Sequence, residues 1–173
     1  MGDLTFVLGG TRSGKSRFAR ERAIALGGDR VTFVATARAG DAELDARIAA
    51  HRRDRPPAWR TVEADTDLDS SVAAVAAEDV LLLDSLTLWV AWCLDRGVDP
   101  RSGWAPVERA ITERRPPTIV VSDEVGLGIV PPSPLARRFV DDLGSLHQLV
   151  ARQAVTVVLL VAGVPMVVKG RSS

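Results

Sequence analysis

Five short, continuous apolar runs separated by polar segments constrain the fold more than any other feature of the sequence. The runs are rich in Val, Leu and Ile and span residues 4–9, 31–36, 79–85, 118–124 and 156–163. Runs of this kind, which do not alternate with polar residues, are typical of strands buried on both faces of a parallel sheet. Helical spacing is found between them, near residues 15–27, 41–53, 86–95, 104–114 and 133–152. The sequence therefore predicts an α/β fold with a mostly parallel sheet flanked by helices.

Turn residues complete this outline of the chain. Loops are expected at residues 27–30, 55–59, 97–103 and 130–134. Gly163 and Pro165 predict a turn after the last apolar run, so the tail is expected to return as a short antiparallel edge strand. Because there is no internal repeat and no stretch typical of a linker, we expect residues 1–173 to form a single domain.

Charge and composition exclude several classes of function. The 22 basic residues are balanced by 22 acidic ones, so no general affinity for nucleic acid is expected. Cys93 is the only cysteine, which excludes an intramolecular disulfide, and its apolar neighbours predict a buried side chain. The N-terminus lacks a signal-peptide pattern, and Gly163 and Pro165 interrupt the longest apolar run. We therefore expect a cytoplasmic protein without membrane insertion.

A phosphate-binding motif follows the first predicted strand. The segment GGTRSGKS fits G-x-x-x-x-G-K-[ST] at every fixed position and leads into a predicted helix. In this motif small residues let backbone N–H groups surround a phosphate, the lysine reaches the outer phosphates, and the final hydroxyl binds Mg²⁺. A glycine-rich turn that matches by chance is the alternative, which the flanking strand and helix disfavour. The residues expected to bind the nucleotide are Gly9, Gly10, Thr11, Arg12, Ser13, Gly14, Lys15 and Ser16.

A carboxylate at a neighbouring strand end would supply the second anchor for Mg²⁺. Asp84 ends the run VLLLD and is the predicted partner of Ser16 in such a site. Asp123 and Glu124 follow another predicted strand end. Capping of the next helix is the alternative role for a strand-end carboxylate.

The second informative stretch is basic and contains one of the two histidines. His51 lies in the last turn of a predicted helix, beside Arg52, Arg53 and Arg55, and Pro56 ends the segment. A solvated basic helix end is one interpretation. A polyphosphate site is the other, in which arginines bind phosphate and disfavour protonation of an imidazole that attacks phosphorus. The other histidine, His147, is expected to pack against a helix or lie on the surface.

Taken together, these segments resemble the adenosylcobinamide kinase / adenosylcobinamide-phosphate guanylyltransferase family of cobalamin biosynthesis. The most specific parts are H-R-x-x-R-P-x-x-W-x-T-x-E over residues 51–63 and E-V-G-x-G-I-V-P over residues 124–131. The resemblance covers nearly the whole chain, in the segments LGGTRSGKSRFARE (8–21), VATARAGDAELDARIAAHRRDRPPAWRTVE (34–63), VLLLDSLTLWV (80–90), VVSDEVGLGIVP (120–131), LARRFVDDLGSLHQ (135–148) and VVLLVAGVPMVVKG (157–170).

The resemblance implies a P-loop, RecA-like fold and two linked reactions. ATP or GTP phosphorylates the aminopropanol hydroxyl of adenosylcobinamide, and GTP then guanylylates a histidine that passes GMP to the phosphorylated corrinoid. His51 matches that histidine, Lys15 is expected to act in catalysis, and Glu63 and Asp84 match nucleotide-contacting positions. Arg52 and Arg55 are expected to neutralise the phosphates, with Mg²⁺ as cofactor.

The family also implies a homotrimer. Because the helix that carries His51 must approach the phosphate loop for this chemistry, we expect segment 37–60 to move on nucleotide binding. Residues 86–94 are a candidate contact surface of the trimer, or else a core helix. Asp123 and His147 depart from the asparagines that the family often has at these positions.

Two other functions are compatible with the motif. A P-loop kinase for another small molecule would transfer phosphate without a covalent enzyme intermediate, with His51 only structural. A GTP-binding regulator without enzymatic activity is the third possibility. The sequence does not identify the nucleotide preferred in the kinase step or the residues that bind the corrinoid.

Overall fold

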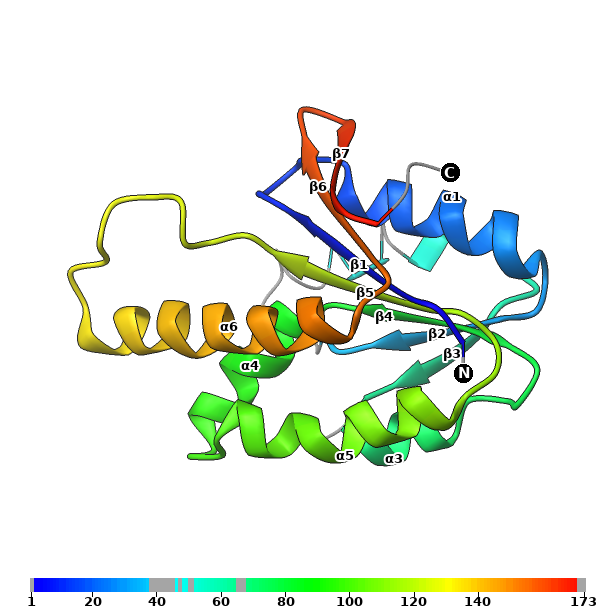
Figure 1. The fold of residues 1–173 in the computed structure, drawn as a ribbon, viewed down its shortest axis with the longest axis horizontal. Helices are drawn as coiled ribbons and strands as arrows, with labels where there is room; N and C mark the ends of the chain where they lie inside the picture. The colour runs from blue at the N-terminus through cyan, green and yellow to red at the C-terminus, as the bar shows by residue number, and fades with distance from the viewer. Residues whose placement is uncertain (1, 38–45, 47, 50–51, 65–67, 171–173) are drawn as a thin grey trace.

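The structure is a computed structural model that describes residues 2–37, 46, 48–49, 52–64 and 68–170. Within these residues, seven strands form one sheet in the order β3-β2-β4-β5-β1-β6-β7 (Figure 1). All neighbouring strands are parallel except β6 and β7, which are antiparallel. The strands are β1 (Leu4–Gly9), β2 (Val31–Ala35), β3 (Arg60–Glu63), β4 (Val80–Asp84), β5 (Thr118–Asp123), β6 (Thr156–Val161) and β7 (Val164–Lys169).

Helices cover both faces of the sheet, as Figure 1 shows. Helix α1 packs on one face, where Ala19 and Ala23 are fully buried against strand residues such as Val7 and Val121. The remaining helices cover the opposite face around a second apolar cluster that includes Phe6. The helices are α1 (Lys15–Gly27), α3 (Leu68–Ala73), α4 (Leu86–Asp95), α5 (Pro100–Glu113) and α6 (Pro134–Gln153).

The predicted fold class is confirmed. Each of the five apolar runs forms a strand within its predicted bounds, and the tail returns as antiparallel β7. Of the predicted helix over residues 41–53, the described residues 46, 48, 49, 52 and 53 are helical. Strand β3 and the six-residue helix α3 were not predicted. Strand β3 has the sequence RTVE and lies at the exposed edge of the sheet, so it lacks an apolar run.

The loop predicted over residues 97–103 is wrong at its C-terminal end, because α5 begins at Pro100. The side chain of Asp99 caps this helix by accepting a hydrogen bond from the Arg101 N–H at 3.2 Å. Proline at the first helical position lacks an N–H that would need a partner there, so Asp-Pro is a favourable helix start.

Helix α4 is a core helix. Leu86, Trp89, Val90 and Cys93 line its buried face, as predicted for Cys93. Burial raises the pKa of the Cys93 thiol to about 11, so the side chain stays protonated and packs as a small apolar group. Of the two roles considered for residues 86–94, core packing is therefore the one that the structure shows.

The C-terminal hairpin packs against the phosphate loop. Gly163 donates its N–H to the carbonyl oxygen of Ser13 at 2.9 Å. A Cβ atom on Gly14 would lie 3.3 Å from the Cα of Gly163, and both glycines have positive φ angles, of 93° and 83°. Side chains at these positions would strain the backbone and separate the two turns. The loop is thus held between α1 and the β6–β7 turn.

No helix in the part of the chain that the structure describes is both long and apolar enough to cross a membrane.

Core packing on the α6 face predicts a large effect of one truncation. Leu143 is fully buried in α6, and its replacement by alanine would leave a cavity, so we expect Leu143→Ala to lower the free energy of unfolding by about 2–5 kcal/mol. Leu135, in the first turn of the same helix, is 66% exposed, and Leu135→Ala should change stability by no more than about 0.5 kcal/mol. Urea unfolding of both variants measures the difference, and equal losses would contradict the assigned packing.

Candidate active site

The candidate active site lies at the carboxyl edge of the parallel strands. Strand pairing aligns Gly9 with Asp123, and it aligns Ala35 with both Glu63 and Asp84. Parallel pairing brings these strand ends to one edge, where open α/β sheets bind their ligands. The structure therefore gathers the ends of β1, β3, β4 and β5, each of which carries a predicted or candidate site residue.

The phosphate loop connects β1 to α1 in a conformation suited to an anion. Ser13 N–H donates to Gly10 O at 3.1 Å, and positive φ angles at Arg12 and Gly14 complete the turn. Gly14 precedes the helix without a side-chain cap, and the first turn of α1 has no acidic residue. The N–H groups and the helix dipole are thus available to a phosphate group.

Two polar side chains of this loop bear on its function. Lys15 Nζ donates to Gly10 O at 3.2 Å, so the ammonium group folds back over the loop. The buried hydroxyl of Ser13 has no hydrogen-bond partner among the described residues. Buried polar atoms without partners are uncommon and indicate that a ligand or water completes the site.

Asp123 forms an ion pair with Lys15. Asp123 is expected at a strand end, where it departs from the family's asparagine, but no local pattern predicts this contact. The register of β1 and β5 explains it, because Asp123 lies directly beside Gly9, where the loop begins. Thr87 Oγ1 accepts the Asp123 backbone N–H at 2.7 Å and so fixes the end of β5.

His147 belongs to a buried polar chain behind this site. Its Nε2 atom lies 2.8 Å from Ser122 Oγ, which in turn lies 3.1 Å from Thr87 Oγ1. Its ring meets Phe6 edge-on, with 5.4 Å between the ring centroids. Of the two expected positions of His147, packing within a helix is confirmed and a surface position is wrong, since only 8% of the residue is exposed.

Burial lowers the pKa of His147 to about 4, although the charges of Glu124 and Asp123 act in the opposite direction. The imidazole is therefore neutral at pH 7.

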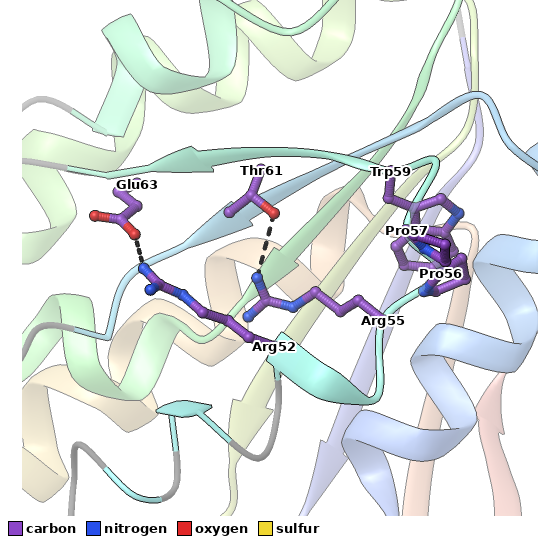
Figure 2. A pocket seen from close by; sticks show the side chains of 7 residues that line it. All are labelled: Arg52, Arg55, Pro56, Pro57, Trp59, Thr61 and Glu63. Carbon is purple, nitrogen blue, oxygen red and sulfur yellow. Dashed lines mark hydrogen bonds and ion pairs between the residues drawn. The ribbon is translucent and has the colours of Figure 1, made fainter.

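A second cluster lies next to the ends of β2 and β3. Arg52 forms an ion pair with Glu63, and Arg55 donates to Thr61 Oγ1 at 3.3 Å (Figure 2). These residues line a pocket of about 350 Å³, together with Pro56, Pro57 and Trp59. Figure 2 shows both guanidinium groups directed toward side chains of β3.

Arg55 connects this pocket to β4. Its guanidinium stacks on the ring of Phe33 at 3.5 Å from the centroid. Burial lowers the pKa of Arg55, while the negative charge of Asp84 acts to raise it. A half-buried guanidinium close to a carboxylate and over an aromatic ring is well placed to bind phosphate.

The structure thus places the predicted residues in two neighbouring groups along one edge of the sheet. One comprises the phosphate loop with Lys15 and Ser16, and the other comprises Arg52, Arg55 and Glu63, with Asp84 near Arg55. His51 lies outside the described residues. No group of three or more His, Cys, Asp or Glu residues within the described ranges could hold a metal ion.

Comparison with solved structures supports the fold. The chain is similar to the crystal structure of the flagellar accessory protein FlaH from Methanocaldococcus jannaschii, with a TM-score of 0.55. The match covers 98% of this chain and 79% of FlaH at 14% sequence identity. At this identity the likeness concerns the fold alone, an α/β sheet flanked by helices.

Comparison of sequences identifies the family. The chain is 45% identical to the bifunctional adenosylcobalamin biosynthesis protein CobP of Pseudomonas aeruginosa, over 95% of this chain and 96% of CobP. It is 39% identical to the bifunctional adenosylcobalamin biosynthesis protein CobU of Salmonella typhimurium, over 96% of this chain and 99% of CobU. Residues 5–168 match the family model described as cobinamide kinase / cobinamide phosphate guanyltransferase. The chain therefore belongs to the cobinamide kinase / cobinamide phosphate guanyltransferase family.

Proposed function

We propose that this bifunctional enzyme of cobalamin biosynthesis carries out both activities at the carboxyl edge of its sheet. In the kinase step, ATP or GTP phosphorylates the aminopropanol hydroxyl of adenosylcobinamide. In the second step, GMP passes from GTP through His51 to adenosylcobinamide phosphate. The observation that carries the proposal is the phosphate loop, which opens at the same sheet edge as the arginine pocket.

The kinase step depends on electrostatic stabilisation by the loop. Backbone N–H groups around Gly10–Gly14 would bind the phosphates, and Lys15 would leave Asp123 to neutralise charge on the transferred group. The acceptor oxygen forms a bond to the γ-phosphorus while the bond to the β-phosphate oxygen breaks. No covalent bond to the protein is needed in this step.

Mg²⁺ fits the oxygen donors that this edge offers. Ser16 supplies a hydroxyl in the first turn of α1, and Asp84 supplies a carboxylate at the end of β4. Mg²⁺ binds one or two such oxygens together with water and substrate phosphates, so a small protein donor set suits it. When bound, the ion would neutralise phosphate charge.

The guanylyl transfer requires two displacements at the α-phosphorus. A ring nitrogen of His51 attacks it and pyrophosphate leaves, after which a phosphate oxygen of the corrinoid attacks and the P–N bond breaks. Arg52, Arg55 and Glu63 follow His51 in the sequence and line one pocket, which supports a role in binding the nucleotide. Segment 37–60 would have to bring His51 to the phosphate loop.

Three further properties belong to this proposal. Residues 1–173 would constitute one nucleotide-binding domain, the enzyme would be a homotrimer, and it would work in the cytoplasm. The homotrimer rests on the family resemblance, and the cytoplasmic location rests on the sequence pattern. The single domain rests on chain length, together with the single sheet that joins all the strands of the described residues.

A covalent intermediate predicts stable labelling of the protein. Incubation with α-labelled GTP and Mg²⁺ should leave an acid-labile, base-stable label on the chain, because a phosphoramidate has this stability pattern. His51→Ala should abolish it, and γ-labelled GTP should give none, since the γ-phosphate leaves in pyrophosphate. Undiminished label in His51→Ala would disprove the assignment, whereas absence of label in the unmodified chain would favour a kinase without a covalent intermediate.

Loss of the loop ammonium predicts loss of phosphoryl transfer. We expect Lys15→Ala to lower kcat for phosphorylation of adenosylcobinamide by about 100-fold or more, because a donor aimed at transition-state charge contributes on this scale. The matched control is Lys169→Ala, since Lys169 Nζ binds carbonyl oxygens at the end of α6, outside the candidate site. A Lys15→Ala variant with the turnover of the Lys169→Ala variant would contradict the role of the loop.

A further inference from the structure

We propose that Glu124 accepts the proton of the acceptor hydroxyl in the kinase step, and that His147 is its positioning residue. The inference rests on the proposed kinase function and extends it to the side of the second substrate.

Glu124 lies beside the phosphate loop. It follows Asp123 directly, and its N–H donates to Gly9 O at 3.0 Å, which continues the β1–β5 pairing by one residue. Asp123 contacts Lys15, the side chain that reaches the outer phosphates in a loop of this kind. Glu124 is therefore next in sequence to Asp123, whose contact with Lys15 marks the expected position of the transferred phosphate.

Alternation along β5 separates the two carboxylates. Val121 belongs to the apolar cluster on the α1 side of the sheet, and Asp123 pairs with Lys15, the first residue of α1. Ser122 contacts His147 of α6, and Glu124 lies near the same imidazole. Because successive side chains of a strand point to opposite faces, Asp123 serves the phosphate loop while Glu124 lies on the α6 side. Glu124 is thus available to a second substrate that approaches the phosphate from that side.

Glu124 also differs from Asp123 in its charge environment. Lys15 neutralises Asp123, whereas among the described residues Glu124 has only His147 within ion-pair distance, with Oε2 and Nδ1 3.9 Å apart. The buried imidazole is neutral at pH 7, so it does not compensate the carboxylate charge. The Glu124 side chain is 23% exposed, so a substrate hydroxyl can reach it. A carboxylate that is reachable and carries no paired cation is suited to accept a proton.

The hydrogen bonds of the buried chain fix the orientation of His147. Thr87 Oγ1 accepts the Asp123 N–H, so its own hydrogen is available to Ser122 Oγ, and the Ser122 hydrogen is then available to His147 Nε2. A neutral ring whose Nε2 accepts carries its hydrogen on Nδ1, the atom that faces Glu124. If the hydrogen bonds ran the other way, with His147 Nε2 donating to Ser122 Oγ, a lone pair of Nδ1 would face the Glu124 carboxylate, which is repulsive.

One oxygen of Glu124 is held by a hydrogen bond, and the other lies near His147. Gly126 N–H donates to Oε1 at 2.7 Å, and Nδ1–H of His147 faces Oε2. Nδ1 and Oε2 are 3.9 Å apart, which is beyond hydrogen-bond distance, and we expect them to approach when substrate binds. In the reaction, the acceptor oxygen bonds to the γ-phosphorus, the nucleoside diphosphate leaves, and the hydroxyl proton moves to Glu124 and then to water.

Glu124→Gln tests the proton acceptor. The amide keeps the size of the side chain but cannot take the proton, so kcat for phosphorylation of adenosylcobinamide should fall by about 100-fold or more. KM for the nucleotide should stay unchanged, and α-labelled GTP should still label the protein. Glu113→Gln, at an exposed position near the end of α5, is the control and should behave as the unmodified enzyme.

Two substitutions of His147 separate positioning from packing. An asparagine amide can occupy the place of Nδ1 and donate to Glu124, whereas a glutamine amide can occupy the place of Nε2 and keep the bond to Ser122. Positioning predicts that His147→Asn retains kinase kcat and that His147→Gln loses about tenfold or more, as displaced catalytic groups do. A purely structural role predicts the reverse order.

Three results would overturn the inference. They are an unchanged kinase kcat in Glu124→Gln, a joint loss of labelling and kinase activity in that variant, and a His147→Gln variant at least as active as His147→Asn. If the unmodified enzyme showed no kinase turnover, the proposed kinase function would be contradicted, and the inference about Glu124 would be contradicted with it. Turnover in the unmodified enzyme that persists in Glu124→Gln overturns the role of Glu124 alone.

Discussion

The pairing of β5 between β1 and β4 is the constraint on which the candidate site depends. It places Asp123 level with Gly9, so that the carboxylate meets Lys15, and it brings Asp84 to the same edge. The strands on which this register rests are buried on both faces, between α1 and the helices of the other side. A one-residue change in register would move each of their side chains to the opposite face of the sheet, so core packing and site geometry are specified by the same residues.

The edge of the sheet is divided between two kinds of binding group. Around β1 they are mainly backbone N–H groups and one ammonium, which suit the outer phosphates of a nucleotide. Around β3 they are the guanidinium groups of Arg52 and Arg55, which bind carboxylates and phosphates with defined geometry. Behind the phosphate loop, the hydroxyls of Ser122 and Thr87 and the imidazole of His147 satisfy one another within an otherwise apolar layer. Two linked reactions at phosphorus are consistent with this division.

Local patterns predicted much of the fold, and less of the site. The apolar runs and GGTRSGKS identified five strands and the phosphate loop, because burial on both faces leaves a continuous apolar signal. Strand β3 could not be predicted in this way, since RTVE is an exposed edge strand, although Asp99-Pro100 did carry a signal for the start of α5. The contact of Lys15 with Asp123 and that of Ser122 with His147 depend on strand order and on the placement of α6. Neither is encoded in local spacing, and the position of His51 relative to the loop stays a prediction.

The central claim is that one edge of the sheet holds a triphosphate while His51 attacks it. A crystal structure of the enzyme with Mg²⁺ and a GTP analogue resistant at the α–β bond tests this most directly. The account predicts the β- and γ-phosphates on the loop beside Lys15, and a ring nitrogen of His51 in line with the bond from the α-phosphorus to its leaving oxygen. It would be contradicted by a triphosphate bound away from the loop, or by His51 remaining distant from the α-phosphorus.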